Sequence, residues 1–178
     1  RYRAGDLHVT AVVPRGQFDW IKQNLASELH VSPQLNTYYY GFNLRRDPFK
    51  DNPGLRRALS MAIDREKLAQ AVLKVGGVPA YGWIPPGVYE YTSQKFDYSN
   101  QPMPERIAEA RKLYAEAGYS AAKPLRFELR YNSGEVHDRL AVGITSVWKQ
   151  TLGAEVQPRA VEFKSLLQDI DRGDVDMF

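Results

Sequence analysis

Apolar positions recur along the chain with two different periods, one typical of helices and one typical of strands. Between residues 17 and 29, apolar residues return every three or four positions: Phe18, Ile21, Leu25 and Leu29. This spacing predicts an amphipathic helix. Between residues 124 and 131 they occupy every second position instead: Leu125, Phe127 and Leu129. That alternation predicts a strand with one buried face.

The second half of the chain alternates between strand and helix patterns. Strands are predicted over 124–131 and 154–161, and a third begins at 174–178. Helices are predicted over 104–118, 134–153 and 162–173, each ended by a glycine. The resulting β-α-β-α-β order implies an α/β fold, with a parallel sheet flanked by helices and right-handed crossovers. Ligands of such sheets gather beyond the carboxyl ends of the strands.

The first half carries weaker strand signals and two helical segments. Residues 6–13 are rich in β-forming residues and predict a short strand that ends at Pro14. Asn52 can cap one helix and Asp64 a second, which is predicted to stop at Gly76–Gly77. The predicted buried side of both helices consists of apolar residues: Leu55, Leu59, Ala62, Ile63, Leu68, Val72 and Leu73.

Residues 78–104 hold many of the prolines, glycines and tyrosines and predict a long ordered loop. Its aromatic side chains either fix the loop to the domain or contact a ligand, and the pattern fits both roles.

Three consecutive tyrosines occur in "TYYYGFN", residues 37–43. Strand alternation puts Tyr38 and Tyr40 on one face and Tyr39 on the other. Three interpretations fit: a core strand with polar tips, a stacking platform, or one wall of a ligand cleft. We interpret Tyr39 as a core residue.

Composition and charge narrow the possible functions. The net charge is +3, and basic and acidic residues are interleaved, as in "RRD" at 45–47 and "DREK" at 64–67. Nucleic-acid binding needs clustered Lys and Arg, so this pattern argues against it. The absence of cysteine excludes disulfides and thiolate chemistry. The chain starts at Arg1 and stops at Phe178 within an apolar pattern, so we expect it to be a segment of a longer protein.

No catalytic or metal-binding motif is found in the sequence. The nucleophile-elbow, zinc-protease, phosphate-loop and dinucleotide-binding patterns are all missing, and no two histidines have metal-ligand spacing. Asp171, Asp174 and Asp176 could indicate a cation site, but Arg172 lies among them, which favours a solvated helix end. We therefore predict no enzyme activity, no metal and no cofactor.

One polar stretch, "YNSGEVH" at residues 131–137, joins a predicted strand end to a helix start. Ser133 can cap the helix, and His137 lies one turn further on. The free N–H groups of a helix start, together with a histidine, can receive a carboxylate. The alternative is that Ser133 is only a cap and His137 only a solvent-facing residue.

Four further stretches resemble, in the same order, the peptide-binding proteins of ABC importers. They are "NPGLRRALSMAIDREKL", "VPAYGWIPP", "EARKLYAEAGY" and "LGAEVQPRAVEFKSLLQDIDRGDVDMF". The resemblance covers essentially the whole chain, and "TYYYGFN" and "YNSGEVH" match the oligopeptide and murein-peptide branch of solute-binding protein family 5.

The resemblance implies one lobe of a bilobed type II periplasmic-binding-protein fold. Residues 1–43 would be the end of the first lobe and the hinge strand, and 44–178 a partial second lobe truncated at its C-terminus. The implied whole protein is a monomeric receptor that binds oligopeptides and delivers them to a membrane permease. It would be periplasmic, or lipid-anchored outside the cytoplasmic membrane in a Gram-positive organism.

The resemblance also implies peptide-binding residues. Tyr40 matches a tyrosine that lines the cleft, Tyr38 would share its face, and His137 matches a histidine that helps to hold the peptide carboxyl end. Phe163 stands where relatives carry a tryptophan, and Ile170 where they carry a ligand-facing arginine, so that anchor is missing here. Two other functions stay open: a receptor for murein tripeptide or other specialised cargo, or an enzyme or scaffold that reuses the fold.

Overall fold

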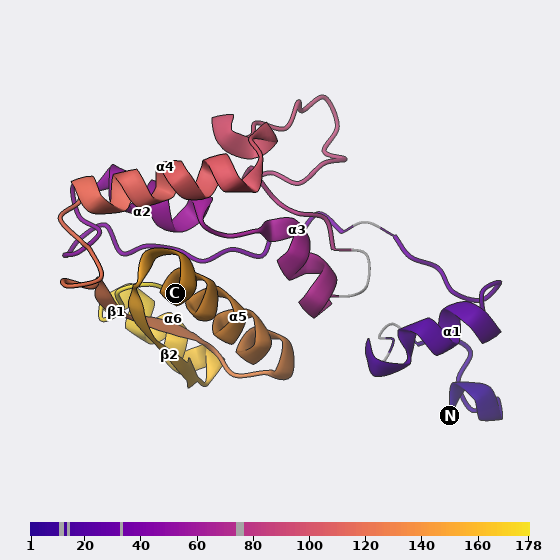
Figure 1. Ribbon diagram of the computed structural model, residues 1–178. Coiled ribbons are helices and arrows are strands. Elements are labelled where there is room, and N and C mark those ends of the chain that lie inside the picture. Colours follow the sequence, from indigo (N-terminus) through magenta and orange to yellow (C-terminus); the bar gives the residue numbers. More distant parts are fainter. Residues whose placement is uncertain (11–12, 14, 33, 74–76) are drawn as a thin grey trace.

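The computed structural model describes residues 1–178 except 11–12, 14, 33 and 74–76. Its helices are α1 (Phe18–Asn24), α2 (Pro53–Met61), α3 (Arg65–Leu68), α4 (Met103–Glu116), α5 (Glu135–Leu152) and α6 (Phe163–Arg172). Its strands are β1 (Arg126–Asn132) and β2 (Glu155–Val161). Short 3-10 turns occupy Tyr2–Ala4, Arg15–Gln17 and Asp97–Asn100, and a π turn, Ala69–Leu73, extends α3. Helices α2 to α6 and the sheet form one body, and residues 1–30, which include α1, lie apart from it (Figure 1).

The sheet has the parallel arrangement that the alternating pattern predicts. β1 and β2 pair in parallel, from Arg126 opposite Glu155 to Asn132 opposite Val161. On the other side of β1, Met177 forms a parallel bridge with Leu129 and an antiparallel bridge with Phe42. The predicted third strand is therefore present only as isolated bridges. The order across the sheet is β2, β1, residues 176–178 and residues 41–43.

One face of β1 forms the centre of the core. Phe127, Leu129 and Tyr131 are buried, as the two-residue period predicts. The Trp148 indole of α5 packs on Phe127, with ring centroids 5.8 Å apart. Its Nε1–H donates to the carbonyl of Leu59 in α2 at 2.8 Å. This buried bond satisfies the indole N–H and joins α5 to α2.

The caps predicted for the first two helices are confirmed. The Asn52 side chain accepts from the Leu55 N–H at 3.1 Å, and the Asp64 side chain from the Lys67 N–H at 3.0 Å. Leu55, Leu59 and Ala62 are buried, whereas Ile63, Leu68 and Val72 are half-buried. The burial predicted for Leu73 and the stop at Gly76 lie outside the described residues.

A buried arginine fixes the loop of residues 78–102 to the helices. Arg106 of α4 donates to the Tyr81 hydroxyl at 2.8 Å and to the Ile63 carbonyl at 2.8 Å. Its guanidinium lies over the rings of both Tyr81 and Tyr98. These two tyrosines therefore hold the loop, whereas Trp83 and Tyr89 are exposed.

The N-terminal predictions fail in part. The strand predicted over 6–13 is wrong for 6–10, and 11–12 lie outside the described residues. No described strand lies beside this stretch to pair with it, and Val9 is 79% exposed. α1 begins close to its predicted start but ends at Asn24 instead of 29, because Leu25 leaves the helical conformation (φ −135°).

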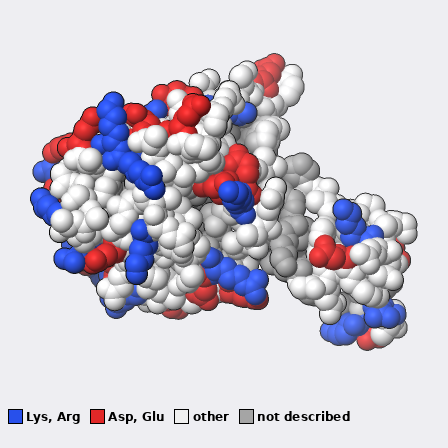
Figure 2. Space-filling view, in the orientation of Figure 1, with Lys and Arg blue, Asp and Glu red and all other residues white. Residues whose placement is uncertain are grey.

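Charged residues of both signs are mixed on the surface. Figure 2 shows Lys and Arg interspersed with Asp and Glu over the visible face, in keeping with the interleaving in the sequence.

Among the described residues, no helix combines the length and the apolar character needed to cross a bilayer.

Candidate functional site

Tyr38 and His137 meet where the tyrosine segment crosses the start of α5. The Tyr38 hydroxyl lies 2.9 Å from His137 Nδ1, although the two residues are 99 positions apart. Their rings are stacked, with centroids 5.3 Å apart and planes 16° apart. Tyr38 remains 47% exposed. The pair therefore offers a flat aromatic surface with polar atoms at its edge.

Tyr40 shares this face, as strand alternation predicts. Its ring meets the Tyr38 ring edge-on at 5.6 Å, and the two hydroxyl oxygens are 3.5 Å apart. Tyr40 is half-buried and packs against the core. Burial raises the pKa of Tyr40 far above its ordinary value of 10.0, and burial also raises the pKa of Tyr38. Both side chains therefore stay neutral phenols.

Tyr131 adjoins this cluster and was not predicted as a site residue. It is buried near the carboxyl end of β1. Burial raises the pKa of Tyr131, and the neighbouring Asp138 carboxylate raises it further. The sequence held one signal for it: Tyr131 continues the alternation of Leu125, Phe127 and Leu129 up to the end of a parallel strand, where ligands gather.

The prediction that Ser133 caps α5 is wrong. Gly134 occupies the N-cap position, no side chain bonds to the helix start, and Ser133 is exposed. The Ser133 N–H instead donates to the Val161 carbonyl at 2.8 Å, which extends the β1–β2 pairing by one residue. Because the main chain of Ser133 still pairs with β2, Ser133 precedes the N-cap position of α5, and its side chain does not cap the helix. Among the described residues, the first N–H groups of α5 thus have no side-chain partner.

Phe163 lies at the same edge of the sheet. Asn132 and Val161 are paired at the ends of β1 and β2, so α5 and α6 both start beyond this edge. Phe163 is the first residue of α6 and is 57% exposed. Phe163 and the start of α5 therefore lie beyond the same edge of the sheet, with no ring contact between Phe163 and the Tyr38–His137 pair among the described residues.

Tyr39 points away from the candidate site, and the interpretation of Tyr39 as a core residue is wrong. It is 50% exposed and packs on Trp83 of the long loop, with ring centroids 4.5 Å apart. Thr37 Oγ1 donates to the Trp83 carbonyl at 2.9 Å and fixes this contact. Among the described residues, the ring contact of Tyr39 is with this loop, and Tyr39 stays half open to solvent.

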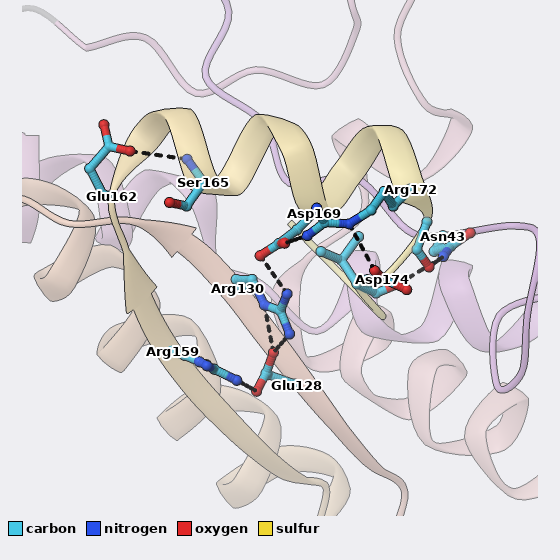
Figure 3. Close-up of polar contacts among 11 residues, drawn as sticks. Asn43, Glu128, Arg130, Arg159, Glu162, Ser165, Asp169, Arg172 and Asp174 are labelled. Carbon is cyan, nitrogen blue, oxygen red and sulfur yellow. Dashed lines mark hydrogen bonds and ion pairs between the residues drawn. The ribbon is translucent and has the colours of Figure 1, made fainter.

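A cluster of charged residues on the opposite face of β1 was also not foreseen (Figure 3). Arg130 donates to Glu128 and, at 2.7 Å, to Asp169 of α6. Asp169 also accepts from Arg172, and Glu128 from Arg159. The signal in the sequence was the alternation itself, since Glu128 and Arg130 lie between the buried residues of β1. The cluster holds α6, and so Phe163, against the sheet.

Two of the three aspartates considered as cation ligands, Asp174 and Asp176, have basic partners, and Asp171 is exposed. Asp174 pairs with Arg172 at 3.1 Å, and Asp176 with Arg46 at 3.3 Å. The described residues contain no cluster of His, Asp and Glu side chains that could hold a metal ion.

An open hollow of about 420 Å³ lies in the N-terminal segment, far from the aromatic cluster. Its lining residues are Tyr2, Arg3, Leu7, His8, Leu25 and Glu28. Within it the Tyr2 hydroxyl donates to the Glu28 carboxylate. We place the candidate site at Tyr38, Tyr40 and His137 instead, because rings and polar atoms from distant segments converge there.

A family comparison decides what kind of protein carries this cluster. Residues 1–178 match the model of the bacterial extracellular solute-binding proteins, family 5 (middle region). The chain belongs to this family. Its α/β body is thus part of a lobe of the type II periplasmic-binding-protein fold.

Individual relatives agree with the family assignment. The chain is 43% identical to the probable deoxycholate-binding periplasmic protein YgiS of Escherichia coli K12, over 98% of this chain and 32% of the relative. It is 38% identical to the periplasmic oligopeptide-binding protein OppA of Salmonella typhimurium LT2, over 99% and 33%. The solved murein tripeptide binding protein MppA of Escherichia coli superposes with a TM-score of 0.88, at 33% identity over 99% and 35%. The chain spans about a third of the length of these curated relatives.

Proposed function

We propose that the whole protein is an extracytoplasmic receptor that binds oligopeptides and delivers them to an ABC importer permease. The observation that carries this proposal is the stacked Tyr38–His137 pair at the carboxyl edge of the sheet. Ligands of open α/β sheets bind at this edge. The family is one of solute-binding proteins, and OppA and MppA are named for peptide binding. We infer a binding role without catalysis.

The cluster can hold a peptide in three ways. Flat aromatic rings pack against peptide planes and apolar side chains. The imidazole of His137 and the Tyr38 hydroxyl can exchange hydrogen bonds with the peptide backbone. The uncapped start of α5 presents N–H groups that favour a carboxylate. We assign Tyr38, Tyr40, His137 and Phe163 as peptide-binding residues.

We further propose that residues 1–43 end a first lobe and include the hinge strand, and that 44–178 belong to a second lobe. The separation of residues 1–30 from the helix-and-sheet body supports this division (Figure 1). The two lobes would close on the ligand. The expected state is a monomer in the periplasm, or outside the cytoplasmic membrane on a lipid anchor, with no nucleic-acid partner.

A specialised cargo is the second candidate. Besides Phe163, α6 exposes Leu167, which is 46% accessible, and both lie on its apolar side. Such a surface also suits an amphipathic ligand with a rigid apolar body, and one relative is named for probable deoxycholate binding. Murein tripeptide, the ligand in the name of MppA, is a third possible cargo.

Calorimetry on the whole protein separates these cargoes. We expect binding of short peptides, and a Kd raised about tenfold by Tyr40→Ala or His137→Ala, which is typical for loss of an important contact. His30→Ala is the matched control, because His30 is exposed in the N-terminal segment. Binding of deoxycholate or murein tripeptide alone would replace the oligopeptide proposal. An unchanged Kd in both variants would show that the site is elsewhere.

A further inference from the structure

The Tyr38 hydroxyl lies between two hydrogen-bond partners and has one proton to donate. His137 Nδ1 is 2.9 Å away and the Tyr40 oxygen is 3.5 Å away. The longer contact has the geometry for Tyr38 to donate to Tyr40. The shorter contact works in either direction, depending on which ring nitrogen of His137 carries the proton. Two proton arrangements are therefore compatible with the same atomic positions.

The two arrangements differ in the hydrogen-bonding role of the other ring nitrogen of His137, Nε2. If Tyr38 donates to Nδ1, the imidazole proton is on Nε2, which is then a hydrogen-bond donor. If Tyr38 donates to Tyr40, Nδ1–H donates to the Tyr38 oxygen, and Nε2 carries a lone pair that accepts. No described residue bonds to Nε2, so this atom is available to a ligand.

The two arrangements are close in free energy. The first makes one bond of normal length between Tyr38 and Nδ1. The second makes a bond of the same length in the reverse direction and adds the long, weaker bond to Tyr40. A neutral imidazole in water prefers neither tautomer strongly enough to outweigh the free energy of a hydrogen bond. Both phenols keep their protons, because burial raises the pKa of Tyr38 and Tyr40.

We propose that Tyr38 and Tyr40 together set the tautomer of His137, so that Nε2 can meet either a hydrogen-bond acceptor or a donor of the ligand. The inference rests on the peptide-binding role proposed for this site. Tyr40 is a positioning residue here, since it acts on His137 only through the Tyr38 hydroxyl. The acceptor class is a carboxylate or carbonyl oxygen, and the donor class is an amide N–H. One site then takes peptides that differ in the group they present to it.

Nitrogen NMR on the ligand-free whole protein tests the tautomer directly. Histidine is labelled with 15N at about pH 8.5, where a typical imidazole is neutral. The His137 signals are assigned by their loss in His137→Asn. We expect both tautomers in the wild type and a shift toward Nε2–H in Tyr40→Phe, because Tyr38 then has no competing acceptor. Tyr38→Phe should give the ratio of a free imidazole.

Tyr39→Phe is the matched control, since it removes a neighbouring hydroxyl from the opposite face and should leave the tautomer ratio unchanged. The same ratio in the wild type and in Tyr40→Phe overturns the inference. A wild-type ratio equal to that of Tyr38→Phe also overturns it, because the phenols would then have no influence.

Binding supplies a second readout, with two peptides that differ only at the C-terminus: one ends in a carboxylate, which only accepts hydrogen bonds, and the other in a primary ammonium group, which only donates them. Tyr40→Phe should weaken binding of the ammonium peptide about threefold to tenfold relative to the carboxylate peptide, as expected for one hydrogen bond. An unchanged ratio of the two Kd values overturns the inference. If the wild type binds neither peptide, the proposed function fails, and the NMR ratio alone decides the tautomer inference.

Discussion

Gly134 brings the chain close to the imidazole of His137. Its φ is 155°, and a Cβ built there would lie 3.2 Å from His137 Cδ2, tighter than ordinary van der Waals contact. The backbone turns here from the end of β1 into α5, and only a residue without a side chain leaves the ring where it meets Tyr38.

Gly134→Ala should therefore disturb the site more than the addition of one methyl group at an open position would. The methyl group pushes the imidazole from the Tyr38 hydroxyl, and the strained φ costs about 1–3 kcal/mol of unfolding free energy. We expect weaker peptide binding in calorimetry and a lower midpoint in urea. Gly16→Ala is the matched control, because nothing lies within 4 Å of a Cβ at that exposed position. Equal effects of the two substitutions would contradict a close fit at Gly134.

The sequence predicts the positions of some residues in and near the site correctly and those of others wrongly. Alternation alone is enough to place Tyr38 and Tyr40 on one face, because neighbouring strand residues point to opposite sides. It cannot say what covers the other face, so Tyr39 was misjudged. The capping role of Ser133 failed for a different reason: the strand pairing continues through its N–H, which depends on β2, a distant segment.

Arg106 is a residue that sequence reasoning did not single out at all. Arg106 is 2% exposed, and among the described residues its guanidinium has no carboxylate partner and its Nε has no hydrogen bond. Two tyrosine rings and a main-chain carbonyl compensate for its burial instead. An arginine in an amphipathic helix pattern normally indicates a solvated face, so burial of this kind has no local signature.

At the scale of elements, the prediction of α5 and α6 was accurate because each helix combines a clear apolar period with a glycine stop, and that of β1 because its apolar residues alternate. α5 and α6 end at Gly153 and Gly173, both in the left-handed conformation. Elements that need a partner were less predictable. Residues 37–43 have strand composition but pair only at 41–43, through the bridge to Met177. The π turn after α3 has no counterpart in sequence periodicity.

The start of α6 depends on the charge of Glu162. The carboxylate accepts from the Ser165 N–H at 3.0 Å, and main-chain bonds from Lys164 and Ser165 lower the pKa of Glu162 below its ordinary value of 4.5. A lowered pKa in the folded state means that the carboxylate stabilises the fold above the unfolded value. This stabilisation is lost as the pH falls through the folded value.

Glu162→Gln should therefore destabilise the protein slightly at pH 6 and not at all near pH 2, because the wild-type carboxyl is then also neutral. Urea unfolding of both proteins across this range measures the difference. Glu116→Gln provides the control, since Glu116 is exposed at the far end of α4. A difference between wild type and Glu162→Gln that stays constant with pH would show that the cap acts without its charge.

At the scale of the whole molecule, the candidate site is one open wall. Tyr38 and Phe163 remain about half exposed, although such side chains gain most free energy when they are covered. The core below them is continuous from β1 through Trp148 to α2, so the wall is rigid. The sequence alone does not predict this openness, because the exposure of a side chain depends on every segment that packs nearby.

Peptide binding should accordingly bring the proposed lobes together. A bound peptide covers part of the aromatic wall, and closure of the other lobe buries the rest, so ligand-bound protein should have a smaller radius of gyration in small-angle X-ray scattering. The solved MppA structures include one described as an unliganded open form, which fits an open state without ligand. The His137→Ala variant should need a higher peptide concentration to close but should reach the same radius of gyration at saturation. This substitution weakens one contact with the peptide without altering the lobes. Tight binding with an unchanged radius would show that the wall works without a second lobe, and would remove the basis for a hinge at residues 37–43.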